Sequence, residues 1–250
     1  MNESIDWLGH ATVRIELDGI RILTDPTIRE RIGPLDRKVA PIPHREVEAI
    51  DVVLISHLHL DHLDLASLRR LGDARIIVPA GAGSILRAAG HRDVDEFAPG
   101  EQTSHGSLTI DIVRAEHSGF RPPFGPTAPA LGFVVSNGRR RIYFAGDTAI
   151  HSGMAEMPDL DVALVPVWGW GPNLSRGHMD PRMAADALTL LRPRIALPIH
   201  WGTFWPKALD RVRPDRLRLP GSEFQAAAAE IAPGVHTEVL APGERLSRLG

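Results

Sequence analysis

The sequence predicts an α/β protein in which two β-sheets pack face to face with helices on their outer faces, a four-layer αββα sandwich. Three observations lead to this fold class. Strand-like segments outnumber helical ones, hairpins mix with strand–helix–strand units, and no fixed-period repeat of the solenoid type is present. Because no linker-like segment divides the 250 residues, we expect one domain over residues 1–250.

The first half is expected to begin with a strand hairpin. TVRIEL and IRILTD flank Asp18-Gly19, a pair typical of a two-residue turn. Residues 26–48 are rich in proline and polar side chains, and we expect a long irregular loop there. The other elements expected in this half are strands at 51–55, ARIIVP, 94–97, 101–104 and 108–115, and helices at 64–71 and 84–89.

The second half repeats the alternation. Its expected strands are LGFVVSN, RIYFAGDT, DVALVPV and RIALPIHWGT, and its expected helices lie near 151–156, 181–191 and 222–231. The helix at 181–191 has the clearest start, because Asp180 is a favoured N-cap residue and Pro181 suits the first turn. Between the halves, the proline-rich residues 117–130 have the composition of a functional lid.

Composition and charge indicate an ordinary globular protein. Apolar residues make up 43% and charged residues 24%, and the net charge of −3 gives no general attraction to nucleic acid. The basic cluster GRRR follows Asn137-Gly138 and is more simply a hairpin turn. No apolar run is long enough to span a bilayer and no signal-peptide pattern is visible. We therefore expect a cytoplasmic protein without stable membrane insertion or a nucleic-acid partner; self-association into a homo-oligomer stays open.

The stretch ISHLHLDHLD, residues 55–64, concentrates metal-ligating side chains directly after an apolar strand. His57 and His59 lie two positions apart, so in an extended segment they point to the same side and can bind one cation. Asp61 and His62 face another direction and can serve a second cation. Burying these groups without partners would be costly in desolvation, and the absence of cysteine leaves imidazole and carboxylate as the available ligands.

Further candidate ligands follow other expected strands. His117 ends LTIDIVRAE, Asp147 ends RIYFAG and His200 ends RIALPI. The candidates divide into two groups around two cations, with one carboxylate as a bridge. The expected sets are His57, His59 and His117 on one metal, Asp61, His62 and His200 on the other, and Asp147 between them. Taken singly, each strand-end histidine is more simply structural, and Asp147 is more simply a turn residue.

The motifs together resemble the metallo-β-lactamase fold superfamily. SHLHLDHLD matches its H-x-H-x-D-H signature, and AEHSG, FAGDT and LPIHWGT follow in the same order. With WLGHATVRIELDGIRILTDP at the start, the chain is similar to the branch of N-acyl-phosphatidylethanolamine-hydrolysing phospholipase D and the L-ascorbate 6-phosphate lactonases. The resemblance covers about residues 5–244. It implies the αββα fold with a dinuclear site in a cleft along one edge of the sandwich.

The resemblance also narrows the chemistry. Asp147 is more like the bridging carboxylate of phosphodiesterases, lactonases and thioesterases than the corresponding position of true β-lactamases, so antibiotic hydrolysis is disfavoured. The motif GHMDPRMAADAL implies that His178 reaches the reacting group of the substrate, although it could simply help to cap the following helix. Asp25, in LTDP, resembles a carboxylate that orients the His-rich loop, and metal-bound imidazoles need such an acceptor, although it could simply be the turn residue before Pro26. No role is assigned to His10 or His151.

The predicted activity is hydrolysis by a hydroxide that bridges two divalent cations, Zn first, with Mn and Fe as alternatives. Asp61 takes up a proton and His178 stabilises the developing anion or protonates the leaving group. We expect a phosphodiester in a small-molecule or lipid-like substrate; the alternatives are a lactone or carboxylic ester on the same site, or a non-catalytic metal-binding regulatory protein. Seven aromatic residues suggest a partly apolar pocket: Phe120, Phe124, Trp168, Trp170, Trp201, Phe204 and Trp205.

Overall fold

Two seven-stranded sheets form the body of the molecule in a computed structural model that describes residues 3–209, 211–246 and 249. The first sheet has the order β17 (Glu244–Arg245), β1 (Ser4–Gly9), β2 (Thr12–Leu17), β3 (Ile20–Thr24), β6 (Val52–Leu54), β7 (Arg75–Pro79) and β8 (Val94–Phe97). The second has the order β16 (His236–Thr237), β14 (Ile195–Ile199), β13 (Val162–Pro166), β12 (Arg141–Phe144), β11 (Leu131–Ser136), β10 (Leu108–Arg114) and β9 (Gln102–His105).

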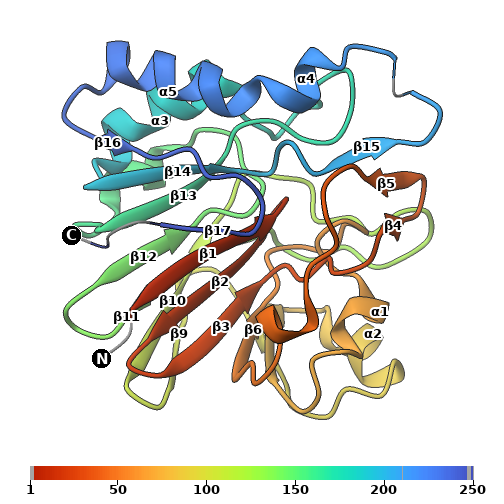
Figure 1. The fold of residues 1–250 in the computed structure, drawn as a ribbon. Coiled ribbons are helices and arrows are strands. Elements are labelled where there is room, and N and C mark those ends of the chain that lie inside the picture. The colour runs from red at the N-terminus through yellow and green to blue at the C-terminus, as the bar shows by residue number, and fades with distance from the viewer. Residues whose placement is uncertain (1–2, 210, 247–248, 250) are drawn as a thin grey trace.

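Helices cover the outer face of each sheet, which confirms the predicted four-layer αββα arrangement (Figure 1). α1 (Leu65–Leu68) and α2 (Gly83–Ala88) lie on the first sheet, and α3 (Pro181–Leu191) and α5 (Pro220–Ile231) lie on the second. The short α4 (Asp215–Arg218) precedes α5, and single 3-10 turns occur at η1 (His44–Glu46) and η2 (Ser152–Glu156).

The central core lies between the two sheets. Alternate residues of the hairpin strands, such as Ile15 and Ile22, pack against Phe133 and Phe144 of the second sheet, and all four are fully buried. Alternation works here because successive strand residues point to opposite faces. The residues on the outer faces form two further clusters under the helices, with Leu86 of α2 in one and Leu188 of α3 in the other.

Most expected elements are present, and the differences arise where pairing is non-local. The turn at Asp18-Gly19 joins β2 to β3 with both residues at positive φ, as predicted. The irregular loop expected at residues 26–48 is wrong in part, because it contains β4 (Arg31–Ile32) and β5 (Leu35–Arg37). These pair with β15 (Phe204–Pro206) in a third sheet, a partner far away in sequence. The expected helix near 151–156 is the 3-10 turn η2.

The carboxyl ends of several central strands meet at one edge of the sandwich. In both large sheets the strands that lead to this edge include parallel neighbours, β3–β6 in the first and β12–β13–β14 in the second. Parallel strands bring the loops that follow them to the same edge. The segments after β3, β6, β12 and β14 are those that carry Asp25, the His-rich loop, Asp147 and His200.

α3 offers a direct test of how the second sheet is capped. Asp180 has extended backbone and its side chain accepts a hydrogen bond from Met183 N at 2.8 Å, with Pro181 in the first turn. Asp180→Ala removes this N-cap, and we expect unfolding to become easier by about 1 kcal/mol, or roughly 2–4 °C in Tm. Denaturant and thermal unfolding measure the change. The exposed Asp186→Ala on the same helix is the matched control and should change little; equal losses in both variants would contradict the capping role.

Candidate metal centre

The predicted ligands converge on one buried centre. The predicted ligand set is His57, His59, Asp61, His62, His117, Asp147 and His200. His57 Nε2 and His117 Nε2 lie 3.0 and 3.1 Å from His59 Nδ1, and His62 Nε2 lies 3.0 Å from His200 Nε2. The structure thus brings the set together in the two groups expected from the sequence.

Asp147 lies between the two groups. Its Oδ2 is 3.2 Å from His62 Nε2 and 3.9 Å from the Nε2 atoms of both His57 and His117, and its Oδ1 is 3.2 Å from His200 Nε2. Oδ1 is buried and has no hydrogen-bond partner among the described residues. Both oxygens thus lie closest to histidines of the second group, His62 and His200, while Oδ2 also faces the first group at 3.9 Å, so this carboxylate stands between the groups, where the predicted bridge would lie. The assignment of individual residues to individual metals stays a prediction.

The outer nitrogens of three imidazoles are already bonded. His117 Nδ1 donates to Gly177 O at 2.8 Å, His200 Nδ1 donates to Trp168 O at 3.1 Å, and His62 Nδ1 lies 2.7 Å from Asp25 Oδ2. A neutral imidazole that donates through Nδ1 carries a lone pair on Nε2. Two such lone pairs face each other at 3.0 Å between His62 and His200, an arrangement that repels unless a cation or a proton lies between them.

Asp25 fulfils the orienting contact that the sequence suggested. It follows β3, is fully buried, and accepts hydrogen bonds from Ser56 N at 2.7 Å and Ser56 Oγ at 2.6 Å in addition to His62. Ser56 Oγ is in turn 3.0 Å from His57 Nδ1. One carboxylate therefore fixes the start of the His-rich loop and two of its imidazoles, which is the task expected of a group outside the ligands themselves.

The charge balance of the centre also favours cations. Asp25, Asp61 and Asp147 are at most 6% exposed, and in the described part of the chain all their ion pairs are with histidines. Burial lowers the pKa of His57, His59 and His117, that of His117 to about 4, so these imidazoles do not supply the missing positive charge. Uncompensated buried carboxylates are costly, so the donor set fits divalent cations.

His62 shows the same demand for positive charge. Burial alone would lower its pKa, but the carboxylates of Asp147, Asp61 and Asp25 outweigh burial and raise the pKa well above its usual value. Without a metal, the carboxylates hold a proton on this imidazole. A cation bound between His62 and the carboxylates would take over the role of that proton.

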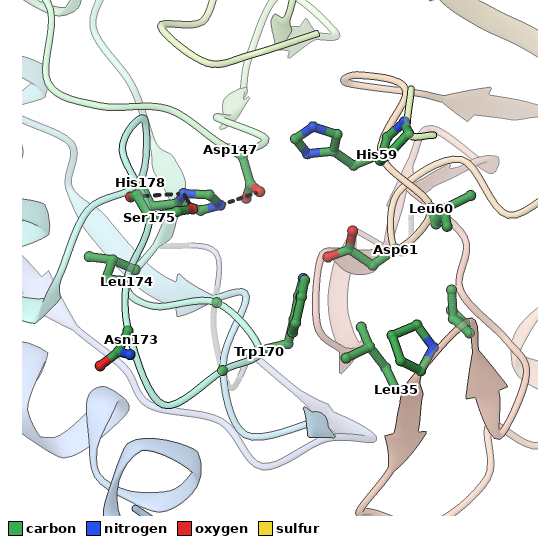
Figure 2. Close-up of a pocket in the computed structure, with 15 residues that line it drawn as sticks. Leu35, His59, Leu60, Asp61, Asp147, Trp170, Asn173, Leu174, Ser175 and His178 are labelled. Carbon is green, nitrogen blue, oxygen red and sulfur yellow. Dashed lines mark hydrogen bonds and ion pairs between the residues drawn. The ribbon is translucent and has the colours of Figure 1, made fainter. Parts of the chain in front are cut away.

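His178 approaches the centre from the opposite wall. It precedes α3, and its Nε2 lies 3.2 Å from Asp147 Oδ2 while Nδ1 lies 3.2 Å from Ser175 O and 2.9 Å from Ser175 Oγ. Burial lowers its pKa, but Asp147 more than compensates and the net shift is upward. Figure 2 shows His178 and Asp147 together, across the pocket from His59 and Asp61. The predicted role of His178 at the reacting group stays a prediction, with this placement in its favour.

The pocket beside the centre is largely apolar. It has a volume of about 410 Å³, and His59, Asp61, Asp147 and His178 form its polar end. The other walls come from the small third sheet, the loop after β13 and the His-rich loop, and they include Ile32, Leu35, Leu60, Trp170 and Leu174. The expectation of many pocket aromatics is mostly wrong: of the seven proposed, Trp170 alone lines this pocket among the described residues.

The other aromatics have structural positions instead. Phe204 and Trp205 are about 1% exposed, and Trp201 stacks on Trp7 with ring centroids 5.4 Å apart. Trp168 is buried and contributes its carbonyl group to His200. These side chains anchor the loops that carry ligands, which sequence position alone cannot distinguish from lining a pocket.

The proline-rich segment 117–130 contacts the His-rich loop, as expected of a segment near the site. Arg121 Nη1 donates to Leu58 O at 2.8 Å and to Leu63 O at 3.1 Å, and Pro122 lines the pocket. Phe120 and Phe124 at the same segment are exposed, Phe124 to 96%. Arg121 therefore joins this segment to the backbone that carries His59 and Asp61.

Sequence reasoning missed two features of the centre. His10, which follows β1, lies fully inside it, with Nε2 2.9 Å from Asp61 Oδ2. Burial, aided by the nearby His200, lowers the pKa of His10 to about 3. Gly177 is the second: its φ is +80°, and a Cβ there would come within 2.8 Å of His117 Nδ1. His10 stands alone after Gly9, so no spacing pattern marks it as part of a site. The contact of Gly177 is made by its backbone carbonyl group, which a sequence pattern does not reveal. In the part of the chain that the structure describes, His151 makes no hydrogen bond or ion pair with the centre.

A two-sheet αββα sandwich with this histidine–carboxylate centre at one edge defines the class of metallo-β-lactamase-fold proteins. The family profile described as "Beta-lactamase superfamily domain" matches residues 20–201, and the chain belongs to that family. A UPF0173 metal-dependent hydrolase of Methanopyrus kandleri is 32% identical over 251 residues, covering 98% of this chain and 99% of the relative. The chain is thus a metal-dependent hydrolase of the metallo-β-lactamase superfamily, and the resemblance predicted from its motifs is confirmed.

More distant relatives agree on the fold. N-acyl-phosphatidylethanolamine-hydrolyzing phospholipase D 1 of Caenorhabditis elegans is 29% identical over 225 residues, covering 79% of this chain and 63% of that protein. The structure of a metallo hydrolase from Ignicoccus hospitalis superposes with a TM-score of 0.75 at 25% identity, covering 98% of this chain and 97% of the other. An isothiocyanate hydrolase from Delia radicum gut bacteria gives 0.75 at 19% identity, with 98% of both chains covered.

No helix in the described ranges is long and apolar enough to cross a membrane.

The bridging position of Asp147 yields the second prediction. Asp147→Ala removes the carboxylate that faces both groups, so we expect it to bind one fewer metal ion per chain than the wild type and to lose most hydrolase activity while remaining folded. Elemental analysis after reconstitution with Zn or Mn, together with circular dichroism, measures this. Asp159→Ala, an exposed carboxylate, is the control. A folded Asp147→Ala variant with the wild-type metal content and near-normal turnover would refute the bridge.

Proposed function

We propose that the chain hydrolyses a phosphodiester bond in a small-molecule or lipid-like substrate in the cytoplasm, using two divalent cations, Zn first, held by the predicted ligand set. The carrying observation is the pair of facing imidazole groups with Asp147 between them and its Oδ1 unpartnered. Divalent cations at such a centre activate water and polarise the substrate oxygen that gains charge. The residues themselves account for orientation and proton transfer.

The pocket supports a substrate that carries an apolar group. Its polar end is the metal centre, and Leu35, Leu60 and Trp170 offer apolar surface a few side chains away. Trp170 is 38% exposed, so a ligand that covers it would bury additional apolar area. The similarity to the nematode phospholipase D, whose name specifies a phospholipid, supports the same class of bond. Nothing in the pocket lining requires a nucleic-acid partner.

Two residues at the polar end supply proton transfer in the proposed reaction. Asp61 lines the pocket and takes the proton released as the oxygen of water attacks phosphorus. His178 lies across the pocket, and with Nδ1 directed at Ser175 its Nε2 faces the centre. It donates its Nε2 proton to the departing oxygen as the phosphorus–oxygen bond breaks. Because Asp61 and His178 lie on opposite sides of the pocket, one can accept a proton while the other donates one.

A carboxylic ester or lactone is the second candidate, favoured by one observation. No lysine or arginine lines the pocket among the described residues. A phosphodiester carries a negative charge that the bound cations, helped by His178 at most, would have to balance, whereas a neutral ester needs no such balance. The two substrates therefore differ in how strongly their binding depends on the metal charge.

A substrate panel decides between the candidates. Protein reconstituted with Zn or Mn is assayed on alkyl nitrophenyl phosphodiesters, nitrophenyl carboxylic esters and lactones of matched alkyl length. We expect the higher kcat/KM on phosphodiesters, rising with alkyl length because of the apolar walls. The chelated protein is the control and should be inactive. A clear preference for esters or lactones would replace the first candidate with the second, and activity that survives complete metal removal would refute both.

His178 gives a prediction that separates proton donation from metal binding. His178→Ala leaves the predicted ligand set intact, so metal content and Tm should stay nearly unchanged while kcat falls about 100-fold. The loss should be larger for alkyl leaving groups than for nitrophenolate, which needs little protonation. Both substrate types are compared at equal metal occupancy, with the exposed His236→Ala as control. An equal and small loss on both substrates would assign His178 to the loop before α3 instead.

A further inference from the structure

His10 lies inside the metal centre although its sequence context predicts no role for it. It is 1% exposed, its Nε2 is 2.9 Å from Asp61 Oδ2, and its ring centroid is 4.0 Å from that of His200. The edge of the Phe204 ring closes its other side, with centroids 5.3 Å apart. A polar side chain this deeply buried needs a partner, and Asp61 is the partner at hydrogen-bond distance.

The backbone of His10 is held as closely as its ring. Its N–H donates to Thr203 Oγ1 at 2.7 Å, and its carbonyl oxygen accepts from His200 N at 2.9 Å and from Trp7 Nε1 at 2.8 Å. Its φ is +54°, in the left-handed region that few non-glycine residues adopt. Strained conformations persist where surrounding contacts hold them, and they gather at functional sites. The turn after β1 is therefore built to place this imidazole.

We propose that His10 is a positioning residue for Asp61: its Nε2–H donates a hydrogen bond to Asp61 Oδ2 and holds that carboxylate in the orientation that meets His62 and His200. Asp61 Oδ2 lies 3.6 and 3.7 Å from the Nε2 atoms of these two histidines. Without the donor, the buried carboxylate would be free to rotate about its χ2 torsion. This inference rests on the proposed function, because it takes Asp61 to be a metal ligand.

The contacts of His10 make the expected effect selective. His10 lies at hydrogen-bond distance from Asp61, and its ring packs against that of His200 at an angle of 37°; both neighbours belong to the same predicted group of ligands. Within the described residues, the ring contacts and side-chain hydrogen bonds of His57, His59 and His117 involve residues other than His10. Loss of the His10 donor should therefore weaken one of the two metal positions and spare the other.

A different role for His10 is testable at the same atom. His10, Asp61, His62 and His200 together could also hold a cation with His10 as a ligand. A ligand nitrogen carries no proton, whereas the proposed donor carries one on Nε2. The protonation of His10 Nε2 in the metal-loaded protein therefore distinguishes the two arrangements.

The experiment compares His10→Phe, His10→Gln and the wild type, all reconstituted with Zn. Phe keeps a ring of similar size but removes the donor, and Gln places an N–H near the position of Nε2. Competition titration with a chelator of known affinity gives the dissociation constant of each metal equivalent. We expect His10→Phe to weaken one equivalent by about 10–100-fold, the usual effect of losing a partner of a ligand, and His10→Gln to recover most of it. His44→Phe, at an exposed histidine, is the matched control.

The outcomes separate this inference from the proposed function. Fewer than two equivalents in the wild type would overturn the proposed function itself. Two equivalents in the wild type with unchanged affinities in folded His10→Phe would overturn only the role of His10, as would failure of His10→Gln to recover binding. If His10→Phe does not fold, nitrogen-15 spectra of the Zn-loaded wild type still decide: a protonated His10 Nε2 supports the hydrogen bond to Asp61, and an unprotonated one refutes it.

Discussion

The buried negative charge of Asp25, Asp61 and Asp147 is the constraint on which the arrangement of the site depends. These carboxylates lie at the edge of a core made of two packed sheets and are at most 6% exposed, so water screens their charge only weakly. Each is surrounded by imidazoles, whose pKa burial lowers at His57 and His117. Protonated histidines, such as His62, can therefore balance only part of the negative charge of the three carboxylates. The donor set therefore fits divalent cations, which would balance the remaining negative charge.

The orientation of the imidazoles comes from atoms that are not ligands, and these atoms belong to both halves of the chain. Asp25 and Ser56 after β3 and β6 fix one side, whereas the carbonyl groups of Trp168 and Gly177 fix His200 and His117 on the other. Because each sheet supplies both candidate ligands and the acceptors that orient them, the packing of the two sheets brings the two groups of imidazoles together. A rigid centre follows from sheet packing and not from the loops alone.

How much of this was predictable varies with the range of the signal. The ligand-rich stretch at residues 55–64 and the strand ends at Asp147 and His200 were evident, because spacing and strand position are local properties. The N-cap of α3 was evident for the same reason. The third sheet was not, since β5 pairs with β15 across most of the chain. The sequence places Trp201 and Trp205 near the pocket, because neither the stacking of Trp201 on Trp7 nor the burial of Trp205 within β15 of the third sheet can be seen in a sequence. His10 lies in the centre because the backbone turns there with positive φ, and no local sequence pattern predicts this turn.

The buried charge of the centre also explains why the polar and apolar surfaces of the pocket are separated. Every charged or titratable group on its wall belongs to the centre or faces it, so polar recognition and chemistry occupy the same end. The remaining walls are apolar and include Ile32 and Leu35 of the third sheet and Trp170 after β13. They provide apolar contact area but no directional interaction such as a hydrogen bond. Apolar contact discriminates weakly between substrates that differ by a methylene group. Selectivity between such substrates must therefore depend on the length of apolar group that the third sheet and the Trp170 loop leave room for. Relatives with the same centre can differ in these two segments without disturbing the charge balance of the centre.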